Sequence, residues 1–340
     1  MGKIKESRKA LCRANMKVHK GRALSTRNHY VSKFYLSFFK CLPQRGKESL
    51  VWVYDKQQPE PRLESVRKAA VEVDLYALQL GNQRNTELES ILAALESRVK
   101  PVFERWHQKG ERAERCDIEL VAEFLALQYL RVPRSLNLVK EGVEASVIRW
   151  MNSLRDHPER LRALWARMTQ EGNIPEGLTL ESMHRSLQND NGEERPRIVL
   201  NRWAAVCLSI HQSPEIASFL VSMDWRLMRT TEEMNFITSD CPVCPFVIEG
   251  RSAKFGSLLD HPSVEVTFPL SPQVCLVLSR KSSFLGTLSN GADAWEVNRR
   301  IAVMAERFVF ASEKSEAVQQ VVSEFSYTRK GSKIGNAPLK

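Results

Sequence analysis

The chain has 340 residues, of which 50 are Lys or Arg and 40 are Asp or Glu, so its formal net charge is +10. Residues 1–45 hold 12 basic residues and one acid, which leaves 38 basic and 39 acidic residues in the remainder. A generally basic, histone-like protein is therefore excluded, because the positive charge is confined to one segment. No apolar run approaches the roughly 20 residues of a membrane-spanning helix, so we expect no membrane association.

Residues 1–27 are predicted to form a basic, flexible arm. They include no apolar core segment, so we do not expect a secretory signal. Two interpretations stay open: the arm binds nucleic acid through phosphate contacts, or it is a solubilising terminus. The seven cysteines are odd in number and irregularly spaced, which favours free thiols in a reducing cytoplasm.

The fold is predicted to begin at residue 28, where the chain becomes strongly aromatic. Four aromatic residues between positions 34 and 39 recur at helical spacing. Residues 51–55 are a β-type run, and the polar turn over residues 56–61 predicts a hairpin after it.

Helices are predicted through the middle of the chain. The clearest covers residues 86–107, with one apolar stripe and Thr86 as the N-cap of a capping box. A second covers residues 118–130 and ends before Pro133, because the residue preceding proline is pushed out of the α region. Further helices are expected at 138–155, 158–169, 178–188 and 198–221, and a turn at 189–192.

Short β-type runs dominate after residue 230. Strands are predicted at 235–239, 264–268 and 274–278, the last two joined by a turn at 269–272, and a helix at 295–312. Helices in the middle and short strands near the N-terminal and C-terminal parts predict the α+β class.

The expected organisation has three parts. Residues 1–27 are the arm, and residues 28–312 are one α+β domain with a helical middle (86–221) and a β-rich part (235–280). Residues 313–340 are a C-terminal segment that ends in a loose, basic tail from residue 325.

Four stretches of the sequence carry a resemblance to a known family. They read NHYVSKFYL at 28–36, ALQYLRVP at 126–133, FITSDCPV at 236–243 and FPLSP at 268–272. Their order and spacing resemble the bacterial domain-of-unknown-function family 4238, over roughly residues 28–312. Ser32 stands where that family usually has proline, and Cys241 where it usually has a polar residue. The resemblance implies a shared fold and no particular activity.

His29 is the first candidate for chemistry, since it lies where a rigid segment begins. A histidine there could act as general base or metal ligand, because its unperturbed pKa is about 6.5. It could equally hydrogen-bond a backbone carbonyl and anchor the entry of the chain.

Gln128 and Arg131 form the second candidate. They are three residues apart, so they share a helix face in an otherwise apolar segment. One interpretation is a guanidinium fork presented to a carboxylate or phosphate, with Gln128 orienting the ligand. The other is that Arg131 caps the carbonyls at the helix end.

Ser239 and Asp240 form the third candidate, at the end of a predicted strand. Such positions carry catalytic carboxylates and metal ligands, and they also carry Asx-turns that tie off the backbone. A buried ion pair between Asp240 and Arg131 would explain both residues without any activity. A metal site formed by Glu89 and Glu96 together with Asp240 and His29 is a further alternative to a solvated helix face.

The Cys241-Pro-Val-Cys244 pair has the spacing of zinc and redox motifs, yet it lacks the second ligand pair and the βαβ setting. Packing cysteines are therefore expected. The chain also lacks a phosphate-binding Gly-rich loop, a nucleophile elbow and a His-Glu-x-x-His motif. These patterns assign neither a cofactor nor a metal.

Three functional hypotheses follow. The first is a bacterial cytoplasmic enzyme, hydrolase or nuclease-like, in which the five candidates converge in one pocket. The second is a non-catalytic effector or interaction protein, in a toxin or phage-defence setting, in which these residues form a structural polar network. The third is a nucleic-acid-binding module that works through residues 1–27.

Overall fold

The computed structural model describes most of the chain, in segments. They are residues 19–20, 27–41, 48–73, 75, 78–80, 83–85, 87–109, 115–188, 200, 202–230, 234–247, 261–280 and 290–325. The chain divides into two compact units, residues 1–136 with 206–340, and residues 137–205. The division into an arm, a single domain and a C-terminal segment that the sequence suggested stays a prediction.

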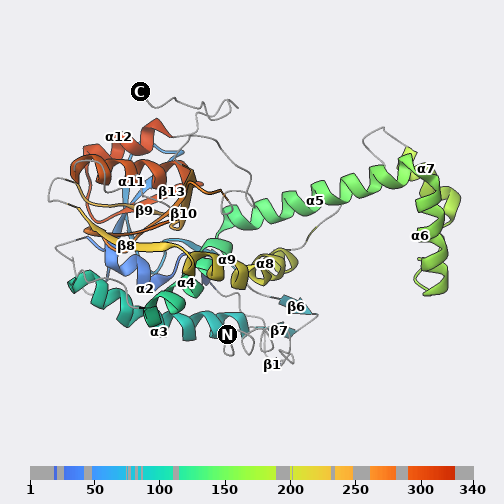
Figure 1. Cartoon of the computed structure of the whole chain (residues 1–340), viewed down its shortest axis with the longest axis horizontal. Helices are drawn as coiled ribbons and strands as arrows, with labels where there is room; N and C mark the ends of the chain where they lie inside the picture. Colours follow the sequence, from blue (N-terminus) through green and yellow to red (C-terminus); the bar gives the residue numbers. More distant parts are fainter. Residues whose placement is uncertain are drawn as a thin grey trace. The chain divides into compact units, whose positions relative to one another are not determined.

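The first unit carries the strands and most of the helices (Figure 1). Its strands are β1 (His19–Lys20), β2 (Arg27–His29), β3 (Leu50–Asp55), β4 (Arg62–Ser65), β5 (Val71–Val73), β6 (Leu78–Leu80), β7 (Gln83–Asn85), β8 (Asp224–Arg229), β9 (Thr238–Ser239), β10 (Cys244–Val247), β11 (Val264–Pro269), β12 (Val274–Ser279) and β13 (Phe308–Ala311).

The helices begin after β2. They are α2 (Lys33–Leu36), the 3-10 turn η1 (Ser37–Phe39), α3 (Glu87–Lys109), α4 (Arg115–Leu130), α5 (Pro133–Asp156), α6 (Pro158–Gln170), α7 (Leu180–Gln188), α8 (Arg202–His211), α9 (Ser213–Val221), α11 (Asn290–Met304) and α12 (Glu316–Glu324). Within the described segments, no helix is both long and apolar enough to cross a membrane. The α+β class predicted from the sequence is confirmed.

Two four-stranded antiparallel sheets position the motif residues. One has the order β10-β11-β12-β8 and the other β4-β3-β13-β9. The hairpins predicted after residues 51–55 and around 269–272 are confirmed, because β3 pairs with β4 and β11 pairs with β12. The second sheet joins distant parts of the chain, since Val309 of β13 lies opposite Tyr54 on one side and Ser239 on the other.

The helix predicted over 295–312 is wrong beyond Met304. The chain leaves α11 there and Phe308–Ala311 becomes β13. Aromatic and β-branched side chains in Phe308-Val309-Phe310 fit a pleated strand, and the partners β3 and β9 are distant in sequence. The helix predicted over 198–221 is likewise interrupted at Gln212, between α8 and α9.

Three local predictions lie outside the described residues. They are the Thr86 capping box, the turn at 189–192 and the tail beyond residue 325.

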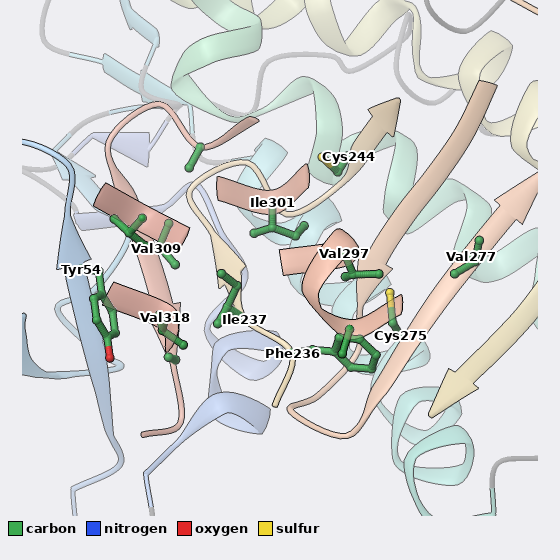
Figure 2. Close-up of a cluster of buried hydrophobic side chains, with 14 residues drawn as sticks. Tyr54, Phe236, Ile237, Cys244, Cys275, Val277, Val297, Ile301, Val309 and Val318 are labelled. Carbon is green, nitrogen blue, oxygen red and sulfur yellow. The ribbon is translucent and has the colours of Figure 1, made fainter. Parts of the chain in front are cut away.

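One hydrophobic core cluster lies between helices α11 and α12 and the strands. Val309, Val318 and Tyr54 gather at one end of it and Cys275 and Val277 at the other (Figure 2). α11 and α12 lie side by side (Figure 1), and both contribute to this cluster together with β13.

A second, aromatic cluster joins α2, α3 and α4 to β11. Tyr35 stacks on Phe268 with 4.7 Å between ring centroids, and Phe103 meets Phe124 edge-on at 5.5 Å. Offset and edge-on pairs of this kind are favourable beyond their buried area. The aromatic start predicted for the fold therefore serves as core.

The second unit is helical, with most of α5, α6 and α7. Within residues 137–188 the buried side chains are Val139, Leu154 and Leu161. This unit thus buries few apolar side chains within itself.

Candidate functional site

Gln128 binds the turn that follows β2. Its Nε2 donates to the Tyr30 carbonyl at 2.8 Å, and its Oε1 accepts from the Ser32 amide at 3.2 Å. Gln128 is fully buried. Unpaired peptide groups in the interior are costly. The Gln128 side chain therefore supplies the turn with hydrogen bonds that a neighbouring strand would otherwise make.

Arg131 follows the end of α4 and holds Gln128 in place. Its Nη2 donates to Gln128 Oε1 at 2.6 Å, and Nη1 and Nη2 both lie 3.1 Å from Glu96 Oε1 of α3. The guanidinium is thus occupied by Glu96 and Gln128. The ion pair between Arg131 and Asp240 that the sequence suggested is wrong, because Arg131 pairs with Glu96 of α3 and Asp240 binds backbone amides.

Asp240 binds the backbone between α11 and β13. Its Oδ1 accepts from the Glu306 amide at 2.9 Å, and its Oδ2 from the amides of Arg307 at 2.7 Å and Phe308 at 2.8 Å. Burial raises the pKa of this carboxyl, although the three amides oppose the shift. Just before it, Ser239 is buried in β9 and its Oγ accepts from the Cys241 amide at 3.1 Å.

Two further cations bind the same turn and were missed from the sequence. Lys56 Nζ donates to the Ala305 carbonyl at 2.6 Å, and Arg134 Nη1 donates to the Met304 carbonyl at 2.9 Å. Burial lowers the pKa of Lys56 to about 8, against the opposing charge of Asp240. Together with Asp240 they satisfy consecutive peptide groups at the end of α11. A lysine directly after a β-rich run was the only sequence signal.

Tyr30 connects the two groups of polar side chains. Its carbonyl binds Gln128, while burial and then the charge of Asp240 raise the pKa of its phenol. His29 lies next to it and is half-buried. Burial lowers the pKa of His29, while a hydrogen bond with the Val66 backbone and, after it, the nearby charge of Glu96 oppose that shift. Three of the five predicted site residues, His29, Gln128 and Asp240, thus lie around Tyr30.

The metal and thiol alternatives receive no geometric support. Among the described residues, no group of three or more His, Cys, Asp or Glu side chains is placed to hold a metal ion. Glu89 accepts from Asn28 Nδ2 at 2.7 Å. Cys241 and Cys244 are buried free thiols, and burial raises the pKa of Cys244 to about 12, so neither is a thiolate at pH 7.

A separate buried ion network lies between β11 and α11. Arg300 Nη1 is 2.8 Å from Glu265 Oε2 and its Nε is 2.8 Å from Glu296 Oε1, while Arg299 pairs with Glu296 at 2.6 Å. The Arg300 and Glu265 side chains are each 1% exposed. A lone glutamate in the otherwise apolar run 264–268 was the sequence signal for it.

The fold and these contacts define an α+β protein whose motif side chains bind its own backbone. The chain belongs to the family described as protein of unknown function (DUF4238), whose model matches residues 27–315. The family resemblance drawn from the four sequence stretches is confirmed. Neither a curated protein nor a solved structure matches the chain.

Proposed function

We propose that this protein is a non-catalytic interaction protein, and that the polar residues of its sequence motifs stabilise the fold. One observation carries the proposal: the polar atoms of Gln128 and Asp240 bond to peptide groups of the same chain. A catalytic carboxylate must instead reach a substrate within hydrogen-bond distance.

Occupancy and burial both support a structural role. Arg131 is 2% exposed and Asp240 is 4% exposed. A phosphate-binding arginine needs a free fork, yet Arg131 already donates to Glu96 and Gln128. The sealed arrangement is that of a buried polar network, in which every member stabilises the fold only while its partners are present.

The substitution Asp240→Asn separates the two roles. An amide cannot accept three backbone N–H bonds, since one of its two polar atoms is a donor. We expect a loss of about 2–3 kcal/mol in the free energy of unfolding, measured by chemical denaturation. The exposed Asp224→Asn at the start of β8 is the matched control. A variant that unfolds like the parent would contradict the structural role.

A hydrolase or nuclease-like enzyme is a second candidate, and His29 favours it. Burial lowers the pKa of this half-buried imidazole, which lies near Glu96, whose side chain is 25% exposed. A neutral histidine at the solvent edge of a polar network can serve as general base. The test is hydrolysis of single-stranded and duplex nucleic acid by the parent and by His29→Gln. If the parent hydrolyses either substrate, and the variant loses this activity without a change in melting temperature, the proposal of a non-catalytic protein is wrong.

Nucleic-acid binding through residues 1–27 is a third candidate, favoured by the charge distribution. Within this arm the structure describes β1, which pairs with β7 with His19 opposite Arg84, and Arg27 at the start of β2. Phosphate contacts make affinity fall steeply with salt. Deleting residues 1–18 should weaken DNA or RNA binding and reduce its salt dependence, whereas an unchanged, salt-independent affinity rejects the candidate.

A further inference from the structure

Strand β8 is the last strand of the sheet β10-β11-β12-β8, and β12 is its neighbour on the inner side. Successive residues of an antiparallel strand bond alternately to its two sides. The Thr230 amide, directly after β8, donates to the Gln273 carbonyl at 3.0 Å, which fixes this alternation. The residues of β8 whose N–H and C=O groups point away from β12 are therefore Trp225, Leu227 and Arg229. Among the described residues none bonds to these peptide groups, so the edge is open.

The opposite edge of the same sheet is formed by β10 and carries a proline. The Leu270 amide donates to the Val274 carbonyl at 2.8 Å, so by the same alternation Thr267 of β11 bonds to its partner Cys244 of β10. The next residue, Pro245, therefore points outward. Proline has no N–H and is a common means of protecting a sheet edge from a further strand. The outward positions of β8 have no proline, so β8 is the edge that can accept one.

The side chains of β8 place positive charge along this edge. Arg226 and Arg229 are both exposed, and they project from opposite faces of the sheet because they are an odd number of residues apart. Among the described residues no carboxylate pairs with either guanidinium, and Arg229 donates from Nη2 to the His107 carbonyl at 2.9 Å. The single acid of the strand, Asp224, lies at its start. Charge complementarity therefore favours an acidic partner.

We propose that the open edge of β8 binds an extended acidic segment of a partner protein as an added antiparallel strand. The inference rests on the proposed role as an interaction protein and names the kind of partner. An added strand bonds to the outward peptide groups of β8, which is the basis of β-strand addition. A second copy of β8 fits the edge poorly. A two-fold axis at Arg226, Leu227 or Met228 places two like arginines opposite or diagonal to each other, which is destabilising.

The register of β8 predicts the sequence that binds. Toward an added strand Arg226 occupies a non-hydrogen-bonded position, where opposite side chains approach most closely. An acid opposite Arg226, a second acid opposite Arg229 and two β-branched apolar residues between them give the peptide Glu-Val-Val-Glu. In an antiparallel pair the first Glu of the peptide lies opposite Arg229 and the second lies opposite Arg226.

Fluorescence anisotropy of the labelled peptide Ser-Glu-Val-Val-Glu-Ser with the full chain tests this inference. We expect a dissociation constant on the order of 100 μM, because one added strand is far smaller than a standard interface. The matched peptide Ser-Lys-Val-Val-Lys-Ser should bind at least about 10-fold more weakly. Leu227→Pro removes the central outward N–H and leaves the bonds to β12 intact, so it should abolish binding with an unchanged circular dichroism spectrum. Equal affinity for the two peptides, or parental affinity in the folded Leu227→Pro variant, overturns the inference.

A charge exchange tests the register without any change to the backbone. Arg226→Glu should weaken binding of the acidic peptide about three- to tenfold, and the peptide Ser-Glu-Val-Val-Lys-Ser should restore the affinity. Arg162→Glu, at an exposed position of α6, is the control and should bind like the parent. A variant that binds both peptides equally, or a parent that self-associates and excludes the peptide, overturns the inference.

The inference and the proposed function fail separately. A parent that does not bind the peptide leaves the stability loss of Asp240→Asn as expected, so the docking site alone would be rejected. Hydrolysis of nucleic acid that requires His29 rejects the non-catalytic role, whereas the affinity of β8 for the peptide would be unchanged.

Discussion

The two units of this chain reach their stability in opposite ways. In the first unit, side chains of Gln128 and Asp240 complete the hydrogen bonding of backbone turns around a large core. In the second, three side chains are buried between residues 137 and 188 and Ala205 beyond them, and the described ion pairs lie at the surface. Buried polar contacts are strongly coupled to the fold, whereas surface ion pairs contribute little. The first unit should thus be sensitive to single polar substitutions and the second tolerant of them.

The largest expected contrast is between two arginines. Arg300→Met leaves Glu265 and Glu296 without their shared cation in the interior, and we expect a loss of about 3–5 kcal/mol. Arg167→Met in α6 removes an exposed pair with Glu171 and should cost less than about 0.5 kcal/mol. Urea denaturation followed by circular dichroism gives both values. Similar losses for the two variants would remove the contrast between the units.

Removing Gln128 should have the next largest effect. Gln128→Ala leaves the Tyr30 carbonyl and the Ser32 amide unpaired in the interior, which we expect to cost about 2–3 kcal/mol. The melting temperature should fall by several degrees. Gln188→Ala, at the exposed end of α7, is the matched control and should melt with the parent.

The buried Lys56 predicts an unusual dependence of stability on pH. Its pKa is about 8 in the folded chain and 10.5 without burial, so between these values the unfolded chain binds more protons. The free energy of unfolding should therefore rise with pH in this window, by about 1 kcal/mol per pH unit at most. The variant Lys56→Met should lack this rise. Urea denaturation curves of parent and variant between pH 7.5 and 10 give the free energy of unfolding at each pH. Parallel curves for parent and variant would place the Lys56 amine in a solvated setting.

The smallest effect is expected at Ser32. Its Oγ is buried and has no hydrogen-bond partner among the described residues, so Ser32→Ala should stabilise the chain by up to about 1 kcal/mol. Its φ of −53° suits proline, but Ser32→Pro would remove the amide that Gln128 accepts from. The alanine variant should therefore melt above the proline variant. The reverse order would show that fixing φ outweighs that hydrogen bond.

Local sequence patterns were sufficient for the helix at residues 86–107 and for the hairpins. The stripe at residues 86–107 and the turn at 269–272 are local patterns, and both were found as predicted. Local patterns failed at β13, because a strand between β3 and β9 depends on partners more than 60 residues away.

The site was foreseen in part. Gln128 and Arg131 were recognised as polar groups in need of partners, yet the sequence could not show that the partner is Glu96 and not Asp240. Lys56 was overlooked, because a lysine after a strand is ordinarily solvated. Which charges meet in the interior is decided by packing, and no spacing rule encodes it.

The position of β13 also determines when the chain can fold during synthesis. β3 ends at Asp55, and its neighbour in the sheet begins at Phe308. At about 5–20 residues per second, a ribosome needs roughly 10–50 s to make the intervening chain. Throughout that interval the β3 edge of the hairpin lacks its partner strand and is open to pairing with other strands, until Phe308–Ala311 emerges.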